Sequence, residues 1–466
     1  MQRCFSRALV ISAPLLLAPC LSMGKSPDQF LPEHQITSKD CGHILTNTGV
    51  WSPDSEWLVY DTRPDPEGAV FEGNTIEMVN IRTREVRTVY ESKQGAHCGV
   101  ATLNPSGKQV VFILGPERPS PDWQYCAWHR QGVMVDLSAP GSARNLDARD
   151  LIPPFTPGAL RGGTHLHVWG AQGEWIAFTY EDHMLAQLNS TGTGEDINQR
   201  NVGVGIPGRP VVVPKTHPRN HDGEYFSVLV TSTAANPRRG SDEILRACEE
   251  AWIGTNGYIR PNGVRQRRAL AFQGTVLLEN GKTNVEVFVV DLPDVMTEAG
   301  DGPLAGTPTK RPSPPKGTAQ RRITFSGGRK FPGLQGPRHW LRSSPDGEQI
   351  AFLARDDGAI VQLWTVSPNG GAPRQITRND SPIASAFTWS PDGRQIAHLM
   401  DQSVCVTELK SGKTTRLTRP SQESVAPRPE ACVFSPDGCK IAYVKPVSTP
   451  TGSQNQIFIV DLRPDL

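Results

Sequence analysis

Four closely similar phrases recur along the chain: VWSPDSEWLVYD (residues 50–61), RSSPDGEQIAFLARDD (342–357), TWSPDGRQIAHLMD (388–401) and VFSPDGCKIAYVK (433–445). In each phrase a short apolar stretch runs into Ser-Pro-Asp-Gly or Ser-Pro-Asp-Ser, and a second apolar stretch follows. Proline fixes φ, aspartate can close an Asx turn and glycine accepts positive φ, so the phrase predicts a tight hairpin turn. Weaker copies occur at residues 103–115 and 168–182.

Each copy is followed by a third apolar stretch and then by a short fourth one. The seven fourth stretches are HQIT (34–37), VRTVY (86–90), ARNLDA (143–148), RNVGV (200–204), RRIT (321–324), PRQIT (373–377) and TRLT (415–418). Four strands about every 40 residues is the period of a propeller blade. The sequence therefore predicts an all-β, seven-bladed β-propeller.

The two ends of the chain predict how the ring closes. The last repeat supplies three strands and stops at Leu466, while HQIT precedes the first complete repeat. We expect this N-terminal segment to complete the last blade, because closure removes open sheet edges. Residues 25–466 are then one propeller, with insertions at about 207–320 in blade 4.

Two segments of that insertion have their own signals. Residues 241–252 (SDEILRACEEAW) predict a short helix with Ser241 as its N-cap. Its acids, Glu249 and Glu250 among them, are expected on a solvated face, with partner recognition as the alternative. Residues 302–319, rich in proline and glycine, predict a linker.

Composition narrows the class of function. The 466 residues include 44 glycines and 41 prolines, as expected for a turn-rich protein, and 48 Lys+Arg nearly balance 47 Asp+Glu. A neutral chain has no global electrostatic attraction for nucleic acid or anionic lipid. We therefore expect no nucleic-acid partner, and a monomer.

The N-terminus predicts export. A short basic segment precedes the charge-free stretch ALVISAPLLLAPCLS, which is typical of a signal peptide over residues 1–24 and of a periplasmic protein. Lipid anchoring at Cys20 is the alternative. No second apolar run is long enough for a membrane span. The seven remaining cysteines are scattered and predict no disulfide framework.

The first strand of each blade lines the channel of a propeller, so residues about six positions before the turn proline should meet at one mouth. This offset selects His339, His165, Asn47 and Glu430, with Arg338 and Arg161 beside the two histidines. His167 follows His165 by two residues and is expected on the same side of the strand. His97 shares the parity in blade 2.

The Ser-Pro-Asp-Gly phrase followed by Ile-Ala-Phe resembles the repeats of the TolB-type propeller superfamily. More closely, the chain resembles an uncharacterised bacterial family labelled "Tol biopolymer transporter-like". The resemblance follows HILTNTGVWSPDSEWLVYDTRP (43–64), TPGALRGGTHLHV (156–168) and FPGLQGPRHW (331–340). It implies a propeller but no assigned activity. TolB itself carries an additional α/β domain, for which only about ten residues are present here.

The His-x-His before the turn is also similar to the metal site of oligogalacturonate lyases. That resemblance implies manganese or zinc held by His165, His167 and His339, with His97 as a further ligand or base. Arg161 or Arg338 would clamp a substrate carboxylate. The alternative is that these histidines bond neighbouring blades.

Two functions follow as expectations. The first is an exported module of the cell envelope that binds a protein or an acidic saccharide, in keeping with Tol-type biopolymer transport. The second is a metal-dependent polysaccharide lyase. Whether the protein is an enzyme at all is left open by the sequence.

Overall fold

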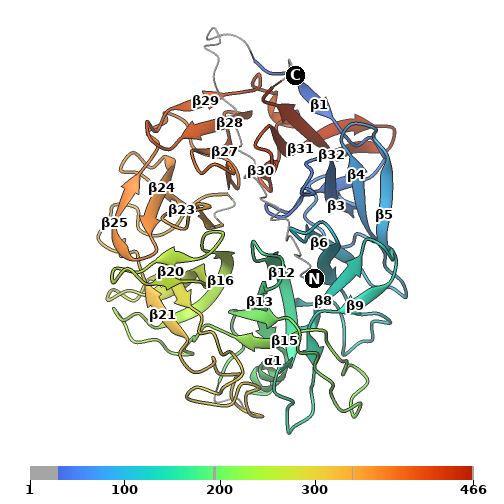
Figure 1. Cartoon of the computed structure of the whole chain (residues 1–466), viewed down its shortest axis with the longest axis vertical. Coiled ribbons are helices and arrows are strands. Elements are labelled where there is room, and N and C mark those ends of the chain that lie inside the picture. The colour runs from blue at the N-terminus through green and yellow to red at the C-terminus, as the bar shows by residue number, and fades with distance from the viewer. Residues whose placement is uncertain (1–29, 193–195, 338–339, 464–466) are drawn as a thin grey trace, which may run out of the picture.

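The computed structural model describes residues 30–192, 196–337 and 340–463, and these form seven four-stranded antiparallel sheets in a ring (Figure 1). Blade 1 comprises β2 (Gly42–Ile44), β3 (Trp57–Arg63), β4 (Thr75–Asn80) and β5 (Val86–Glu91). Blade 2 comprises β6 (Cys98–Leu103), β7 (Gln109–Leu114), β8 (Gln131–Asp136) and β9 (Ala143–Asn145). Blade 3 comprises β12 (Gly162–Trp169), β13 (Ile176–Asp182), β14 (Asn201–Ile206) and β15 (Phe226–Leu229). The predicted seven-bladed propeller is confirmed.

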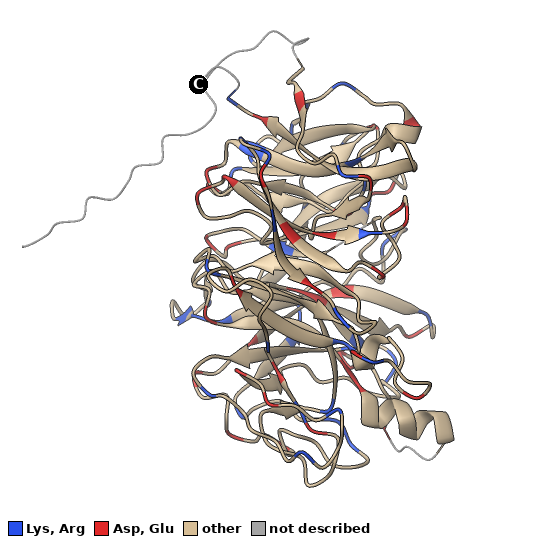
Figure 2. Ribbon diagram, turned by 90° about the vertical axis from the view of Figure 1, so that its right-hand side faces the viewer, with Lys and Arg blue, Asp and Glu red and all other residues tan. Residues whose placement is uncertain are grey.

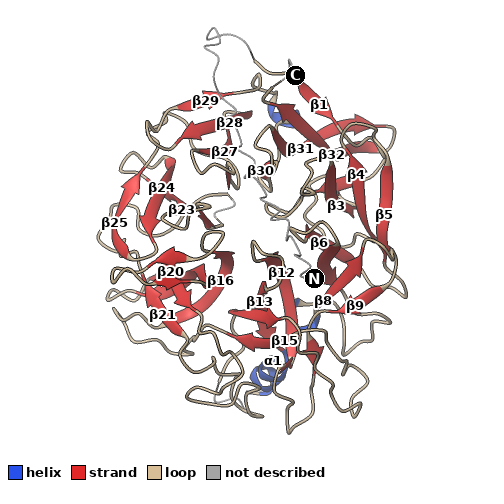
Figure 3. Ribbon diagram, viewed as in Figure 1, coloured by secondary structure: helices blue, strands red, loops and turns tan. Residues whose placement is uncertain are grey.

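The remaining blades complete the ring. Blade 4 comprises β16 (Ile244–Trp252), β19 (Ala269–Leu277), β20 (Thr283–Asp291) and β21 (Ala319–Arg322), and blade 5 comprises β22 (Arg342–Ser343), β23 (Ile350–Arg355), β24 (Val361–Ser367) and β25 (Gly370–Gln375). Blade 6 comprises β26 (Thr388–Trp389), β27 (Gln395–Met400), β28 (Ser403–Glu408) and β29 (Thr414–Arg416). Blade 7 comprises β30 (Cys432–Phe434), β31 (Lys440–Thr449), β32 (Gly452–Asp461) and β1 (Glu33–Gln35). Two small ribbons add β10 (Ala148–Arg149) with β11 (Ala159–Leu160) and β17 (Tyr258–Ile259) with β18 (Arg265–Gln266). Among the described residues the one α-helix is α1 (His183–Thr191), beside the short 3-10 turns η1 (Ala127–His129) and η2 (Glu423–Val425) (Figure 3).

The repeated phrase forms the turn that its residues predict. In blade 6 the Ser390 hydroxyl donates to Asp392 at 2.6 Å, and Asp392 accepts the Arg394 N–H at 3.0 Å. The Gln395 N–H donates back to Ser390 Oγ at 2.9 Å, and Gly393 has φ 70°. Blades 5 and 7 repeat these bonds. The phrase therefore satisfies its own polar groups and needs no neighbour to hold its shape.

Ring closure is also confirmed. β1 pairs antiparallel with β32, with His34 opposite Ile459, and the Ile36 N–H donates to the Ile457 carbonyl at 2.7 Å. The Ile36 side chain is buried in the core cluster that spans blades 7, 1 and 2. The two ends of the chain thus share one sheet.

Tryptophans join adjacent blades through their indole N–H groups. Trp51 donates to the Val433 carbonyl at 3.1 Å, from blade 1 to blade 7. Trp252 and Trp389 donate in the same way to the inner strand of the preceding blade, each at 3.0 Å. The apolar ring fills the space between sheets while its polar tip replaces a missing ladder bond.

Two strand assignments were wrong. The segment RNVGV (200–204) lies in β14, the third strand of blade 3, and the outermost strand is β15. The predicted helix over 241–252 is β16, the innermost strand of blade 4. Two register shifts in β16 place its buried residues Ile244, Ala247, Cys248 and Ala251 three or four positions apart, which imitates the period of a helix.

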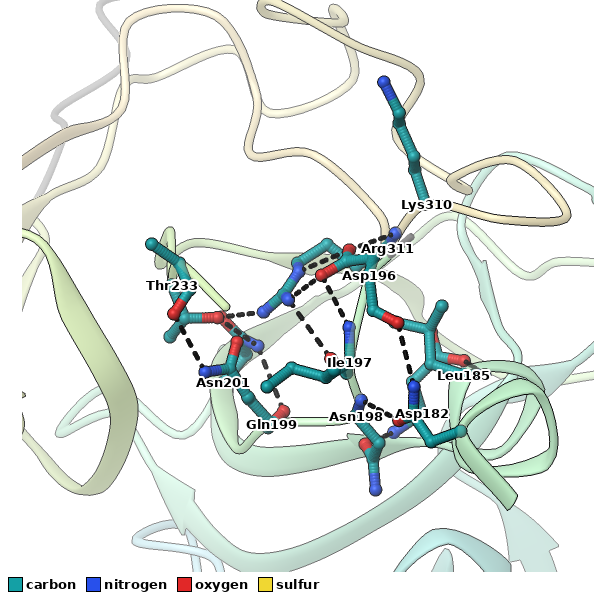
Figure 4. Close-up of polar contacts among 12 residues, drawn as sticks. Asp182, Leu185, Asp196, Ile197, Asn198, Gln199, Asn201, Thr233, Lys310 and Arg311 are labelled. Atoms are coloured by element: carbon teal, nitrogen blue, oxygen red, sulfur yellow. Dashed lines mark hydrogen bonds and ion pairs between the residues drawn. The ribbon is translucent and has the colours of Figure 1, made fainter. Parts of the chain in front are cut away.

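The predicted linker 302–319 is bound to blade 3. Arg161 donates to the carbonyls of Thr307 and Lys310, the latter at 2.7 Å. Arg311 holds the Asp196 carboxylate through its backbone N–H and its guanidinium, with Nε–Oδ2 at 2.8 Å (Figure 4). We call residues 302–319 the strap.

Basic and acidic residues are interspersed over the side of the molecule shown in Figure 2, as expected for a nearly neutral chain. No helix in the described part of the chain is long and apolar enough to cross a membrane. The seven cysteines outside the N-terminal segment are free thiols. The proposed signal peptide and Cys20 lie outside the described residues.

Candidate functional site

The inner strands of blades 2, 3 and 4 share a bulge that the other inner strands lack as described. Val100, Leu166 and Glu249 have φ of 60°, 56° and 57°, and each lies three residues before the last residue of its strand. The ladder shifts register at each of them. Positive φ at a non-glycine residue costs about 1–3 kcal/mol and is found preferentially at functional sites. The bulges therefore single out this part of the channel wall.

A polar group beside these bulges connects blades 3, 4 and 5. We call it the channel cluster, and its members, which act on one another electrostatically, are His165, Arg200, Arg246, Glu249, Glu250 and Arg342. Arg200 pairs with Glu181 at the end of β13, with Nε–Oε1 at 2.7 Å. Glu250 accepts the Thr179 hydroxyl at 2.8 Å, which joins blade 4 to blade 3. Arg246 is exposed.

Burial in the narrow channel disfavours charge on two members of the cluster. It lowers the pKa of His165 well below its usual value, and the positive charges of Arg130 and Arg200 lower it further. It raises the pKa of Glu250 to about 8 against the stabilising hydrogen bond from Thr179. His165 is thus a neutral imidazole at pH 7, and Glu250 is largely a neutral acid that can donate a hydrogen bond.

Three buried polar atoms of the cluster have no hydrogen-bond partner among the described residues. They are His165 Nδ1, Glu250 Oε1 and Arg342 Nε, one on each of three successive inner strands. Burial also lowers the pKa of Arg342 to about 10, although Glu249 and Glu250 act to raise it. Buried polar groups are normally paired, so three such atoms on neighbouring inner strands make this part of the channel wall a candidate site for a polar ligand.

Asn47, predicted as a ligand-binding residue, is held by main-chain contacts. Its side chain donates to the Phe387 carbonyl at 2.9 Å and accepts the Cys432 N–H at 3.2 Å. Its own carbonyl accepts from Arg342 at 3.3 Å. Blade 1 is thereby joined across the channel to blades 5, 6 and 7, and the Asn47 amide is committed to structure.

Arg161, predicted as a carboxylate clamp, is also engaged within the protein. It is 1 % exposed, and its Nε lies 2.7 Å from Asp182. Its remaining donors hold the strap, as described above. Glu430 is half-buried in the loop before β30. Arg338 and His339 lie outside the described residues.

The predicted metal ligands do not come together in the described residues. The bulge at Leu166 breaks the strand parity on which the His-x-His prediction rested. His167 is buried between blades 2 and 3, with Nε2 3.1 Å from Thr164 Oγ1 and its ring 6.2 Å from that of Phe178. Burial lowers its pKa to about 3.

His165, in contrast, has arginines as its charged neighbours, and His97 lies 3.3 Å from the Asn74 side chain in blade 1. Three arginine charges around an imidazole would repel a divalent cation rather than hold it. In the part of the chain that is described, no three His, Cys, Asp or Glu side chains are placed to bind a metal ion. These residues therefore do not fit manganese or zinc.

A second group, which the sequence reasoning missed, lies at the outer side of blades 2 and 3. The rings of Trp123 and His129 stack at 3.7 Å, and His129 Nε2 lies 3.0 Å from His183 Nδ1. Arg149 and Arg219 lie over Trp123 at 5.6 and 5.5 Å. The signal in the sequence is density, since seven of the eleven histidines fall within residues 97–221.

Comparisons with known proteins agree with the fold. The chain is similar to oligogalacturonate lyase in complex with manganese, at a TM-score of 0.54 and 11% identity over 95% of this chain and 96% of that one. It is similar to oligogalacturonate lyase from Vibrio parahaemolyticus at a TM-score of 0.55 and 10% identity, over 93% and 94%. At such identities the likeness shows the propeller fold alone.

The sequence comparisons are more specific. Residues 97–221 match the family model described as a protein of unknown function, DUF3748. Over 415 residues, which cover 88% of this chain and 94% of the relative, the chain is 46% identical to the uncharacterized protein YidR of Escherichia coli (strain K12). The matched family segment contains the bulges of blades 2 and 3 and the Trp123 stack. The chain belongs to the family of YidR.

Proposed function

We propose that the protein is an exported, periplasmic β-propeller that binds an acidic saccharide of the cell envelope in its central channel. The observation that carries this proposal is the channel cluster, in which Arg200, Arg246 and Arg342 come from three adjacent blades. The guanidinium group is a planar fork of donors that matches a carboxylate, and several such groups along a channel match an oligomer with one acid per sugar.

The neutral members of the cluster complement the arginines. A neutral His165 can accept or donate a hydrogen bond to a sugar hydroxyl, and a protonated Glu250 can donate one. The unpartnered atoms of His165, Glu250 and Arg342 would each gain a partner when such a ligand binds. Pairing of these groups supplies specificity for a polyhydroxylated acid over a simple anion.

The test is calorimetric titration of the full mature chain with trigalacturonate, with the neutral trisaccharide maltotriose as reference. Arg246→Gln is the informative variant, because this side chain is exposed and has no bond to lose within the described structure. We expect it to weaken trigalacturonate binding about tenfold, or about 1.4 kcal/mol. The matched control is Arg374→Gln, an exposed arginine on the outer strand of blade 5, which should leave binding unchanged.

The other candidate functions give distinct results in the same experiment. Equal binding of maltotriose, or an unchanged affinity in Arg246→Gln, would overturn the proposal. Tight binding of an envelope protein in place of the saccharide would favour the Tol-type transport role. Appearance of an unsaturated uronate product that requires added manganese would favour the lyase, against the misfit of the described residues to a metal.

A further inference from the structure

A pocket separate from the channel lies between the outer parts of blades 1 and 2. Its volume is about 560 Å³, and its walls include Tyr90 of β5, Gln131 of β8 and Asn145 of β9. Because fourth strands form the outside of a propeller, this pocket opens at the rim and does not share the channel walls. Volumes of this size accommodate a small-molecule ligand.

Blade 3 supplies the remaining wall through its insertion between β14 and β15. Residues 218–221 line the pocket, and Arg219 fastens them to blade 2 by donating to the carbonyls of Glu117 at 2.8 Å and Arg118 at 3.0 Å. The Arg149 N–H and the His221 carbonyl are bonded at 2.9 Å in the same place. Residues of three blades therefore form one pocket, and the insertion reaches blade 2 to supply one of its walls.

The pocket holds two arginines that form no direct ion pair. Arg149 is 2 % exposed and donates to the carbonyls of Gly162 at 3.2 Å and Arg130 at 2.5 Å. Asp147 acts on Arg149 and Asp122 on Arg219 through space, but neither arginine has a carboxylate within ion-pair distance in the described part of the chain. A buried charge without a directly paired counter-charge is costly, and an anionic ligand would reduce that cost.

The other lining groups agree in sign and chemistry. Lys93 adds a third cation and forms no hydrogen bond or ion pair through its side chain among the described residues, while Glu117 is the one acid lining the pocket. His221 Nε2 is buried without a partner. Gln131 Nε2 donates to Asn145 Oδ1, and Asn145 Nδ2 donates to the Asp222 carbonyl at 3.0 Å, so Asn145 orients Gln131. The Gln131 Oε1 atom can accept from a sugar hydroxyl, and the ring of Tyr90 can contact the face of a sugar ring.

We infer that this pocket is a binding site for a monosaccharide-sized ligand that carries one carboxylate or phosphate group. Arg149, Arg219 and Lys93 bind the acidic group against the Trp123 face, and Gln131, oriented by Asn145, binds a hydroxyl group. The ligand would also join blade 1 to the blade 3 insertion. This site is independent of the oligosaccharide proposed for the channel.

The experiment titrates the full mature chain with glucuronate, glucose 6-phosphate, glucose and inorganic phosphate, monitored by calorimetry. We expect at least one acidic sugar to bind at least tenfold more tightly than glucose and than inorganic phosphate. Arg219→Gln should weaken that binding at least tenfold, and Lys93→Gln severalfold. Lys108→Gln, an exposed lysine elsewhere on blade 2, is the matched control and should change nothing.

Comparison of the two acidic sugars identifies the acidic group. Binding of glucose as tight as that of both acids, or no binding of either acid at millimolar concentration, would overturn the inference. Inorganic phosphate binding as tightly as glucose 6-phosphate would also overturn it, because the sugar would then contribute nothing. Lys93→Gln keeps the test decisive if Arg219→Gln releases the insertion. Arg246→Gln in the channel should leave monosaccharide binding intact, which separates this site from the first proposal.

Discussion

Blades 5 to 7 and blades 2 to 4 are built on the same four strands but differ in everything added to them. Blades 5 to 7 keep the Ser-Pro-Asp-Gly turn with its own internal hydrogen bonds, and their inner strands are unshifted as described. Blades 2 to 4 lack the full phrase, carry a bulge at one shared offset, and receive α1, the 207–225 insertion and the strap.

The difference indicates that blades 5 to 7 and blades 2 to 4 have different roles within one ring. Regular blades are locally self-sufficient and stabilise the ring. Departures from the repeat carry the bulged inner strands and the buried arginines Arg149 and Arg161, features that cost free energy and that proteins retain where function needs them. The channel cluster and the pocket between the outer parts of blades 1 and 2 both include residues of blades 2 to 4.

Acidification should produce the largest difference in stability between blades 2 to 4 and blades 5 to 7. Burial lowers the pKa of His129 to about 4 and of His183 and His221 to about 3, all three in blades 2 and 3. An unfolded histidine titrates near 6.5, so the unfolded state binds more protons between pH 6.5 and 4. Stability is therefore fully present above about pH 6.5 and falls as the pH is lowered, by about 1.4 kcal/mol per unit of pKa shift for each group.

Hydrogen exchange at pH 7 and pH 4.5 checks this expectation, and peptides from residues 97–221 should lose protection before those of blades 5 to 7. His398, which is buried and bonded to Thr407 at 2.8 Å, is the one histidine of the described regular blades with a lowered pKa. Uniform loss of protection around the ring would contradict the division. Exposed His34→Asn should not change the pH profile.

Arg161→Met should cost about 3–5 kcal/mol, because it leaves the buried Asp182 carboxylate without its ion pair and releases the strap. Urea denaturation measures the loss, and limited proteolysis should cut within residues 302–319. The control is Arg144→Met, an exposed arginine with two surface ion pairs, where about 0–1 kcal/mol is expected. Equal effects of the two substitutions would show that the strap is not held by Arg161.

Ile36→Pro should cost about 3 kcal/mol, because it removes the bond to Ile457 and a buried side chain at the seam of the ring. The loss should appear in the unfolding midpoint. His34→Ala, an exposed position in the same strand, should be near neutral. If Ile36→Pro were as stable as the wild-type chain, the closing strand would be dispensable.

Gly393→Ala should cost about 1–2 kcal/mol from backbone strain alone. Its φ is 70°, and a Cβ there would meet only Pro345 Cδ at the ordinary distance of 3.5 Å. Gly328→Ala, where φ is not positive and nothing lies within 4 Å of the added carbon, is the control and should not destabilise. Thermal denaturation of both variants measures the contribution of one repeat turn.

The fold was predictable because each repeat can be recognised from its own short stretch of sequence. The turn residues, the apolar strands and HQIT at the beginning of the chain suffice for seven blades and their closure, since all of them act within one blade. Two of the errors fell where a bulge changed the period. In β16 the shift around Glu249 made a strand look like a helix, and around Leu166 it separated the surroundings of His165 and His167.

The candidate sites were predictable only in part. The offset rule selected His165, which lies on the inner strand β12 of blade 3, and it also selected Asn47, whose amide is consumed by contacts from two other blades. Glu250 was assigned to a helix surface, and Arg246 and Arg342 were not selected. Arg149 and Arg219 gave no local signal, because their lack of a direct ion pair is decided only when the blades pack.

Short segments of sequence determine the repeat, the ring and the strand pairing that closes it, because a hairpin turn and an alternating strand depend on neighbouring residues. Which arginine is paired, which histidine is neutral and which side chains face a pocket depended on segments more than 100 residues apart, such as Arg161 with Lys310 and Arg219 with Glu117. Those properties are set by burial and by long-range charge, which exist only after the blades have packed into a ring.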